Sequence, residues 1–219
     1  MKILLRLGIL IALGAAPAAA GTYMQQSTFT LPLASMTGMD SDAVGTLYVL
    51  GLQGGATTYS VASYATQGIT PVFSFNTGLS SPTAFAVEGS GIVNVLDNSG
   101  GPGAITLKRF QNNGTFVGQA QYAVGSPYYP IQAFSSAIDK VNQRVYIAYQ
   151  QWVSYYCLMC LGCPCPPSGI KGFINQYDFA GNLLKSVTMP GIGATAGSCY
   201  TPSQLAADPQ GNLYVADAN

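Results

Sequence analysis

The chain contains no histidine in its 219 residues. Histidine is the commonest general base and a frequent zinc ligand, because its imidazole ring titrates near neutral pH. Its absence excludes a Ser-His-Asp triad and a histidine-ligated zinc site from this sequence.

Charged residues are scarce, at 7% of the chain, and eight Lys and Arg balance eight Asp and Glu. Two of the basic residues, Lys2 and Arg6, fall in the first twenty positions. The others form no basic stripe, so nucleic acid is not an expected partner. The basic pair Lys108-Arg109 is interpreted as a solvated strand edge.

Long apolar runs are missing beyond the N-terminus. Residues 1–20 combine a basic start with an apolar run, Leu7 to Ala16, that is too short to span a bilayer. Ala18-Ala19-Ala20 follows as a small-residue cleavage site. We therefore expect a secretory signal peptide over 1–20 and a secreted, periplasmic or extracellular protein with no membrane span after cleavage. The alternative is an uncleaved N-terminal anchor.

A repeat organises the rest of the chain. Four similar apolar runs are centred on Tyr48, Asn94, Tyr146 and Tyr214, at intervals of 46, 52 and 68 residues. The last interval is long because it contains a Cys-rich insertion at 151–171. A period in the forties with several short strands per unit predicts an all-β protein, a β-propeller of four-stranded antiparallel blades. No helical period of apolar residues is present.

The repeat predicts about three and a half blades in residues 21–219, and therefore an incomplete ring. Their expected ranges are about 35–77, 82–125, 130–190 and 202–219. A strand over 22–34 is expected to complete the last blade of the ring. Because the fourth unit stops after its second strand, we expect the sequence to be a fragment of a longer protein.

Two local patterns carry structural expectations. The second strand of each unit is apolar on both faces, which predicts a core position between neighbouring blades. In the second unit, Asn112-Asn113-Gly114 predicts a hairpin turn, because both turn residues tolerate positive φ. The same turn contains the glycosylation triplet Asn113-Gly114-Thr115, which the turn itself explains.

The last unit, Pro202 to Asp217, contains Leu-Ala-Ala-Asp-Pro-Gln-Gly-Asn-Leu-Tyr-Val-Ala-Asp. It resembles the NHL repeat of six-bladed propellers, the group that includes gluconolactonase-like and TolB-like rings. The resemblance is fair in the second and third units and weak in the first. It implies the fold strongly and the function hardly at all, since members include enzymes, sensors and binding modules.

The resemblance also bears on catalysis and metals. Lyases of this group use histidine, so no catalytic residue is carried over to this sequence. Gluconolactonase-like members hold a divalent cation with acidic and amide side chains, which makes Glu88, the only Glu, a residue to weigh as a ligand. The alternative is a turn role, because most of the acidic residues sit at positions where Asp or Asn caps its own turn. The eight acidic residues of the sequence are Asp40, Asp42, Glu88, Asp97, Asp139, Asp178, Asp208 and Asp217.

The insertion contains Cys157, Cys160, Cys163 and Cys165, and Cys199 follows downstream. Their spacing is compatible with thiolate ligation of zinc or an iron-sulfur cluster. An oxidising compartment favours disulfides instead, with one of the five cysteines left odd. Trp152, Tyr155 and Tyr156 lead into this loop and form a candidate binding loop.

From these observations we expect a non-catalytic binding module with a protein or carbohydrate ligand on a propeller face. No catalytic residue, cofactor or metal site is assigned. One alternative is a propeller enzyme of the lyase or lactonase type whose catalytic residues lie largely outside this sequence. Another is an extracellular structural or adhesive element.

Overall fold

A computed structural model describes residues 33–65, 70–99, 103–125, 131–153, 169–189 and 202–217. Every regular element in these ranges is a β-strand. The described part of the chain has no helix long and apolar enough to cross a membrane.

The strands form three four-stranded antiparallel sheets and one two-stranded sheet, each in simple sequence order. We call them blades 1 to 4. Blade 1 contains β1 (Ser35–Ser41), β2 (Leu47–Leu52), β3 (Ser60–Tyr64) and β4 (Pro71–Asn76). Blade 2 contains β5 (Pro82–Val87), β6 (Val93–Asp97), β7 (Ala104–Phe110) and β8 (Phe116–Ala123). Blade 3 contains β9 (Ile131–Asp139), β10 (Arg144–Val153), β11 (Gly169–Asp178) and β12 (Leu183–Met189), and blade 4 contains β13 (Pro202–Ala207) and β14 (Leu213–Asp217).

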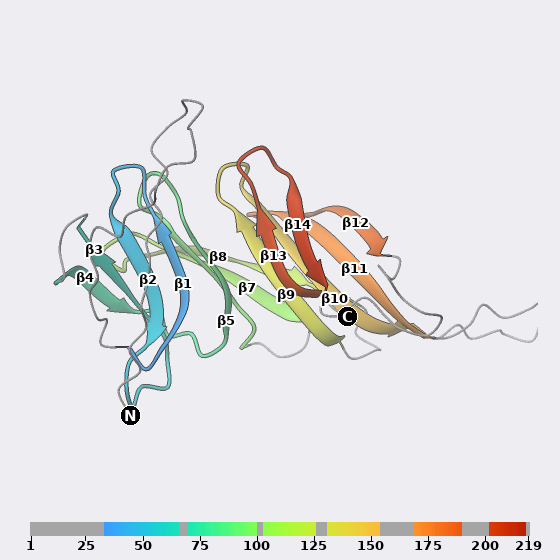
Figure 1. The fold of residues 1–219 in the computed structure, drawn as a ribbon, viewed down its shortest axis with the longest axis horizontal. Coiled ribbons are helices and arrows are strands. Elements are labelled where there is room, and N and C mark those ends of the chain that lie inside the picture. The colour runs from blue at the N-terminus through green and yellow to red at the C-terminus, as the bar shows by residue number, and fades with distance from the viewer. Residues whose placement is uncertain are drawn as a thin grey trace, which may run out of the picture.

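The first strands of the blades lie next to one another. β1 contacts β5, β5 contacts β9 and β9 contacts β13, so the sheets fan out from a common inner side (Figure 1). Radial packing of four-stranded meanders is the β-propeller arrangement. The expected fold class is therefore confirmed, with three four-stranded blades and the first two strands of a fourth. The expected strand over 22–34 lies outside the described residues, except that Ala34 donates its N–H to the Leu52 carbonyl and so extends β1.

The hydrophobic core lies between the blades. Between blades 1 and 2, Tyr48 and Leu50 of β2 pack with Val93 and Val95 of β6. Between blades 2 and 3, the core side chains are Leu96, Ile105, Leu107, Tyr122, Val124, Val145, Ile147, Tyr149 and Tyr177. All five residues of β6 are buried, which confirms that a second strand is covered on both faces. Each large apolar side chain buried in this way stabilises the fold by about 1.5–3 kcal/mol.

One turn design recurs in five hairpins of the described residues. In the turn 111–115, Gln111 N donates to Thr115 O and Gly114 N donates to Gln111 O. The same two bonds occur in turns 42–46, 88–92, 178–182 and 208–212. The fourth residue is always a Gly with φ between 84° and 98°. This is a three-residue loop, a type I turn followed by a left-handed residue. The hairpin expected at Asn112-Asn113-Gly114 is confirmed, because β7 and β8 pair across it, and of these residues only Gly114 adopts a positive φ.

Each four-stranded blade also carries two β-bulges. On the inner strands the register shifts at the second or third residue, as it does between Pro82 and Ala84. On the outer strands the extra residue is Val72, Val117 or Leu184. These three side chains are all exposed. Bulges re-aim side chains and blunt the edge of a sheet, so the outer edge of each blade is modified in the same way.

Candidate functional site

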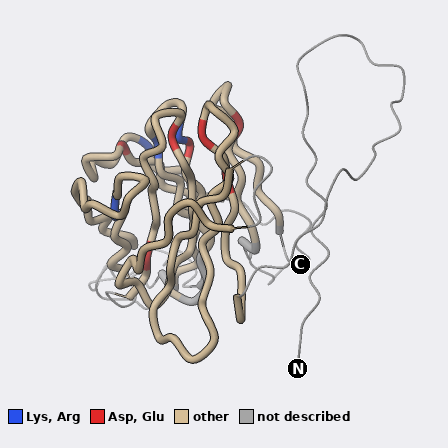
Figure 2. Tube along the Cα trace, turned by 90° about the vertical axis from the view of Figure 1, so that its left-hand side faces the viewer, with Lys and Arg blue, Asp and Glu red and all other residues tan. Residues whose placement is uncertain are grey.

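Four hairpin turns, each joining the first and second strands of a blade, gather at one end of the molecule (Figure 1). We call this surface the hairpin face and define it by residues 42–46, 88–92, 139–144 and 208–212. Hydrogen bonds link the turns: Ala43 N donates to Gly89 O at 3.3 Å, and Asn142 Nδ2 donates to Pro209 O at 3.3 Å. Acidic residues collect at these turn ends (Figure 2).

The acids of the hairpin face mostly bind their own turns. Asp42 Oδ1 accepts the Thr46 N–H at 2.8 Å, and Asp208 Oδ1 accepts the Asn212 N–H at 2.8 Å. Asp139 Oδ1 accepts the Asn142 N–H at 3.0 Å. Asp178 Oδ1 accepts the Asn182 N–H in the same way, at 2.9 Å, in the turn that joins β11 to β12. The expected capping role of these four aspartates is thereby confirmed.

A tyrosine from the following strand supports two of these acids. Tyr48 Oη donates to Asp42 Oδ2 at 3.3 Å, and Tyr214 Oη donates to Asp208 Oδ2 at 3.1 Å. Burial raises the pKa of Tyr48, and the negative charge of Asp42 raises it further. The hydrogen bond to Asp208 is the main cause that raises the pKa of Tyr214. Both hydroxyls therefore stay protonated and remain donors at neutral pH.

Blade 2 replaces this pair with a longer acid and a shorter partner. Glu88 stands where the other blades have Asp, and Asn94 stands where they have Tyr. Asn94 Nδ2 donates to Glu88 Oε1 at 3.1 Å, so the same link is kept. Arg109 from β7 completes the group: its Nη2 lies 2.7 Å from Glu88 Oε1 and its Nε donates to Asn94 Oδ1 at 3.2 Å.

These contacts correct the interpretation of Arg109 and define the partners of Glu88. Arg109 is not a solvated strand edge, because it pairs with Glu88 and its guanidinium lies 5.5 Å from the ring centre of Phe179 in blade 3. Glu88, weighed as a metal ligand, has Arg109 and Asn94 as its partners. Among the described residues, no three His, Cys, Asp or Glu side chains are placed to hold a metal ion.

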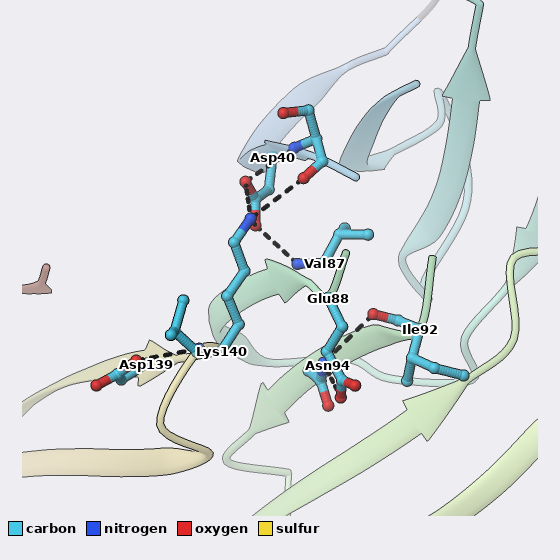
Figure 3. A network of polar contacts seen from close by, with 9 residues as sticks. Asp40, Val87, Glu88, Ile92, Asn94, Asp139 and Lys140 are labelled. Carbon is cyan, nitrogen blue, oxygen red and sulfur yellow. Dashed lines mark hydrogen bonds and ion pairs between the residues drawn. The ribbon is translucent and has the colours of Figure 1, made fainter. Parts of the chain in front are cut away.

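Asp40, near the end of β1, bonds to residues of both blade 2 and blade 3. Its Oδ2 accepts the Val87 N–H of blade 2 at 2.7 Å, and both its oxygens lie 2.7 Å from Lys140 Nζ of blade 3 (Figure 3). Lys140 also donates to the Ser41 carbonyl at 3.1 Å. We call this group the three-blade clasp. Sequence reasoning missed it, although Asp40 occupies a position that is Ala86, Ala137 or Ala206 in the other units.

The arrangement of charges on the hairpin face is that of a rigid scaffold. The carboxylates cap turns, join strands or pair with a cation, and each bond fixes a backbone segment. Away from this face, the buried carboxylate of Asp97 accepts the Ser81 N–H at 2.9 Å and also binds the N–H and hydroxyl of Ser99. The hairpin face therefore holds the blades in register.

The other end of blade 3 carries the feature that distinguishes it from its neighbours. β10 and β11 are each ten residues long, whereas β2, β3, β6 and β7 have five to seven. β9 pairs with β10 only as far as Gln151, and β12 pairs with β11 only as far as Gly172. Among the described strands, Trp152 and Val153 therefore pair with β11 alone, opposite Ile170 and Gly169. This two-stranded extension, which we call the blade 3 ribbon, projects beyond the sheet.

The candidate binding loop begins on this ribbon. Trp152 lies in β10, one residue before the end of the strand. Tyr155 and Tyr156 lie outside the described residues, as do Cys157, Cys160, Cys163, Cys165 and Cys199. Residues 151–153 and 169–171, expected within the insertion, belong instead to paired strands. The disulfides and the alternative thiolate site remain predictions.

Comparison with known proteins adds similarity in fold only. No protein-family model matches the chain, and no curated protein matches it. A solved structure of a protein of unknown function from Bacteroides caccae is similar over 83% of this chain, with 12% identity and a TM-score of 0.41. The structure of the Dos1 propeller is similar over 84% of this chain, with 11% identity and a TM-score of 0.36. The chain covers 53% and 56% of these two structures, about half of their length.

Proposed function

We propose that this chain is part of a secreted β-propeller of the NHL kind that binds its ligand without catalysis. The observation that carries the proposal is the blade 3 ribbon, where β10 and β11 continue past both neighbouring strands and lead into the aromatic and Cys-rich loop. Binding residues are often placed on loops held by a rigid scaffold. The tyrosine-supported turns and the clasp provide that rigidity.

The proposed ligand is an uncharged carbohydrate. The chain has few charges, and those on the hairpin face are largely engaged in turn bonds and ion pairs. Recognition therefore has to rely on apolar and neutral hydrogen-bonding groups, and the aromatic residues Trp152, Tyr155 and Tyr156 of the sequence provide both. An uncharged protein surface is the other ligand class that this chemistry fits, and the experiment below separates the two.

Assignment to the NHL kind rests on the turn chemistry. Residues 178–182 and 208–212 both contain Asp followed at the fourth and fifth positions by Gly-Asn. In both turns the Asn side chain donates to the Asp carboxylate, at 2.9 and 2.8 Å. The bond in turn 208–212 supports the resemblance of that unit to the NHL repeat, and the bond in turn 178–182 is the same turn type used between β11 and β12.

The experiment is binding of the purified chain to an array of immobilised neutral polysaccharides and oligosaccharides. We expect binding to at least one glycan, little effect of added salt, and loss of binding in Trp152→Ala, Tyr155→Ala and Tyr156→Ala. Phe73→Ala is the matched control, because Phe73 is an exposed aromatic residue on the outer strand of blade 1.

Three results would overturn parts of the proposal. Absence of binding to every glycan contradicts the carbohydrate ligand. Equal loss in Phe73→Ala and Trp152→Ala contradicts the ribbon as the site. Cleavage or elimination of a bound glycan, seen by chromatography of the released products, contradicts the non-catalytic role and supports the lyase or lactonase alternative.

A further inference from the structure

The turn 111–115 places an Asn-Gly pair at an exposed hairpin tip. Asn113 is exposed, and Gly114 follows it with φ +87°. The side-chain carbonyl Oδ1 of Asn113 accepts the Thr115 N–H at 3.0 Å. Within the described ranges no residue bonds the side-chain nitrogen Nδ2, which is the group that would leave.

Glycine cannot be exchanged at position 114. A Cβ there would lie 2.6 Å from the Cβ of Phe75 in blade 1, and the positive φ strains any other residue. The fold therefore requires glycine directly after Asn113. Glycine has no side chain, so its backbone nitrogen approaches Asn113 Cγ with little steric hindrance. The structure maintains an Asn-Gly pair because the turn and the blade 1–blade 2 contact both require Gly114.

We propose that Asn113 is a site of spontaneous deamidation, controlled by opening of the hairpin. Gly114 N attacks Asn113 Cγ, a bond forms between these atoms, and the bond from Cγ to Nδ2 breaks. Nδ2 leaves as ammonia with the proton from Gly114 N. Water then opens the resulting five-membered imide at either carbonyl and leaves aspartate or isoaspartate. The Thr115 hydrogen bond to Oδ1 draws electron density from Cγ and favours attack.

Two contacts control the reaction. The attacking nitrogen, Gly114 N, donates its hydrogen to Gln111 O at 2.9 Å, so this bond must open first. Phe75 packs against Gly114, and its ring lies tilted against Phe110 with the ring centres 5.5 Å apart, which holds the turn closed. The rate of deamidation therefore reports how often the tip of blade 2 separates from blade 1. Isoaspartate lengthens the backbone by one carbon and breaks the turn. The change is irreversible because the ammonia is lost to solvent.

The experiment is incubation of the folded chain at mildly alkaline pH, followed by tryptic peptide mapping with mass spectrometry. Cleavage after Arg109 and Lys140 places Asn112 and Asn113 in one peptide, so Asn112 is an internal control. Asn182, whose side chain is bonded to Asp178, is a second control. We expect the mass increase of amide-to-acid conversion at Asn113 with an isoaspartate fraction, and intact amides at Asn112 and Asn182.

Two variants test the mechanism. Phe75→Leu loosens the packing over Gly114 and should accelerate the reaction severalfold in a chain that still folds, as checked by circular dichroism. Asn113→Gln should stop it, because a six-membered imide forms much more slowly. Conversion of Asn113 no faster than that of Asn112 and Asn182 would overturn the proposal, as would a glycan attached to Nδ2. An unchanged deamidation rate in Phe75→Leu would contradict the proposal that hairpin opening limits the rate.

Discussion

Lys140 Nζ lies 2.7 Å from both carboxylate oxygens of Asp40, although 100 residues separate the two in sequence. Both side chains are only partly exposed. The same carboxylate accepts the Val87 N–H, so one acid supports both an ion pair and a backbone hydrogen bond.

The two functions of Asp40 can be separated by substitution. Lys140→Ala removes a partly exposed ion pair and an exposed hydrogen bond to the Ser41 carbonyl, and should cost about 0.5–1 kcal/mol, less at high salt. Asp40→Asn keeps an acceptor for Val87 N–H and should cost about the same. Asp40→Ala leaves that N–H unpaired and should cost about 2–3 kcal/mol. Urea unfolding of the three variants measures these differences, and equal costs for Asp40→Asn and Asp40→Ala would contradict the role of the Val87 bond.

Arg109 should contribute to stability by linking blades 2 and 3. Arg109→Met keeps much of the side-chain volume but leaves Asn94 Oδ1, in a fully buried residue, without this donor. We expect a loss of about 2 kcal/mol, and a loss of about 1 kcal/mol for Arg109→Lys, which keeps the charge near Glu88. Thermal unfolding measures both. Lys108→Met is the control, and a loss as large as that of Arg109→Met would refute this interpretation.

Three glycines form a graded test of backbone strain and space. Gly118 has open space and ordinary φ, Gly55 has open space and φ +80°, and Gly114 has φ +87° and the close contact with Phe75. Substitution by Ala should cost less than about 0.5 kcal/mol at Gly118 and about 1 kcal/mol at Gly55. At Gly114 the cost should reach about 3 kcal/mol, because strain and overpacking add. Chemical denaturation measures the three losses in unfolding free energy. Equal losses at Gly55 and Gly114 would show that Phe75 moves away from the added Cβ at little cost.

Tyr122 and Tyr177 form an edge-to-face pair with ring centres 5.1 Å apart, but their hydroxyls differ. Tyr177 Oη donates to Ala123 O at 2.6 Å, whereas the buried Tyr122 Oη has no hydrogen-bond partner among the residues that the structure describes. Tyr177→Phe should therefore cost about 1–2 kcal/mol, and Tyr122→Phe should be neutral or stabilise by about 1 kcal/mol. Calorimetry of the two variants measures these changes in stability. A clear loss of stability in Tyr122→Phe would show that its hydroxyl has a hydrogen-bond partner.

Acid should weaken the turns. The Asn182 side chain is the main cause that lowers the pKa of Asp178, and the Asn212 side chain is the main cause for Asp208. A lowered folded pKa contributes stability that is fully present above the unfolded value near 3.8 and is lost as the pH falls through the folded pKa. The free energy of unfolding should therefore decline from about pH 4 downward. Asp178→Asn should flatten this decline, and an unchanged slope would contradict it.

The repeat could be predicted because its signals are local. The Asp, Gly and Tyr positions of Asp42, Gly45 and Tyr48 recur in Asp208, Gly211 and Tyr214, and each has a turn or packing reason visible within seven residues. The same link was not recognised in blade 2, where Glu88 replaces Asp and Asn94 replaces Tyr. The two replacements compensate for each other in length, which is visible only when they are considered together.

Contacts between distant segments could not be predicted in the same way. Nothing near Lys140 in the sequence indicates that it reaches Asp40, since the contact depends on how tightly the inner strands pack. Arg109 beside Lys108 has the pattern of an exposed edge, and only the neighbouring blade supplies Phe179.

The three-blade clasp has a consequence for how this arc unfolds. Repeat proteins usually behave as one-dimensional chains in which each unit interacts only with its neighbours, so that a terminal unit can detach alone. Asp40 and Lys140 join blade 1 to blade 3 directly, past blade 2. Opening of blade 1 therefore also breaks a contact of blade 3, and these three blades gain a cooperativity that a chain of nearest neighbours lacks.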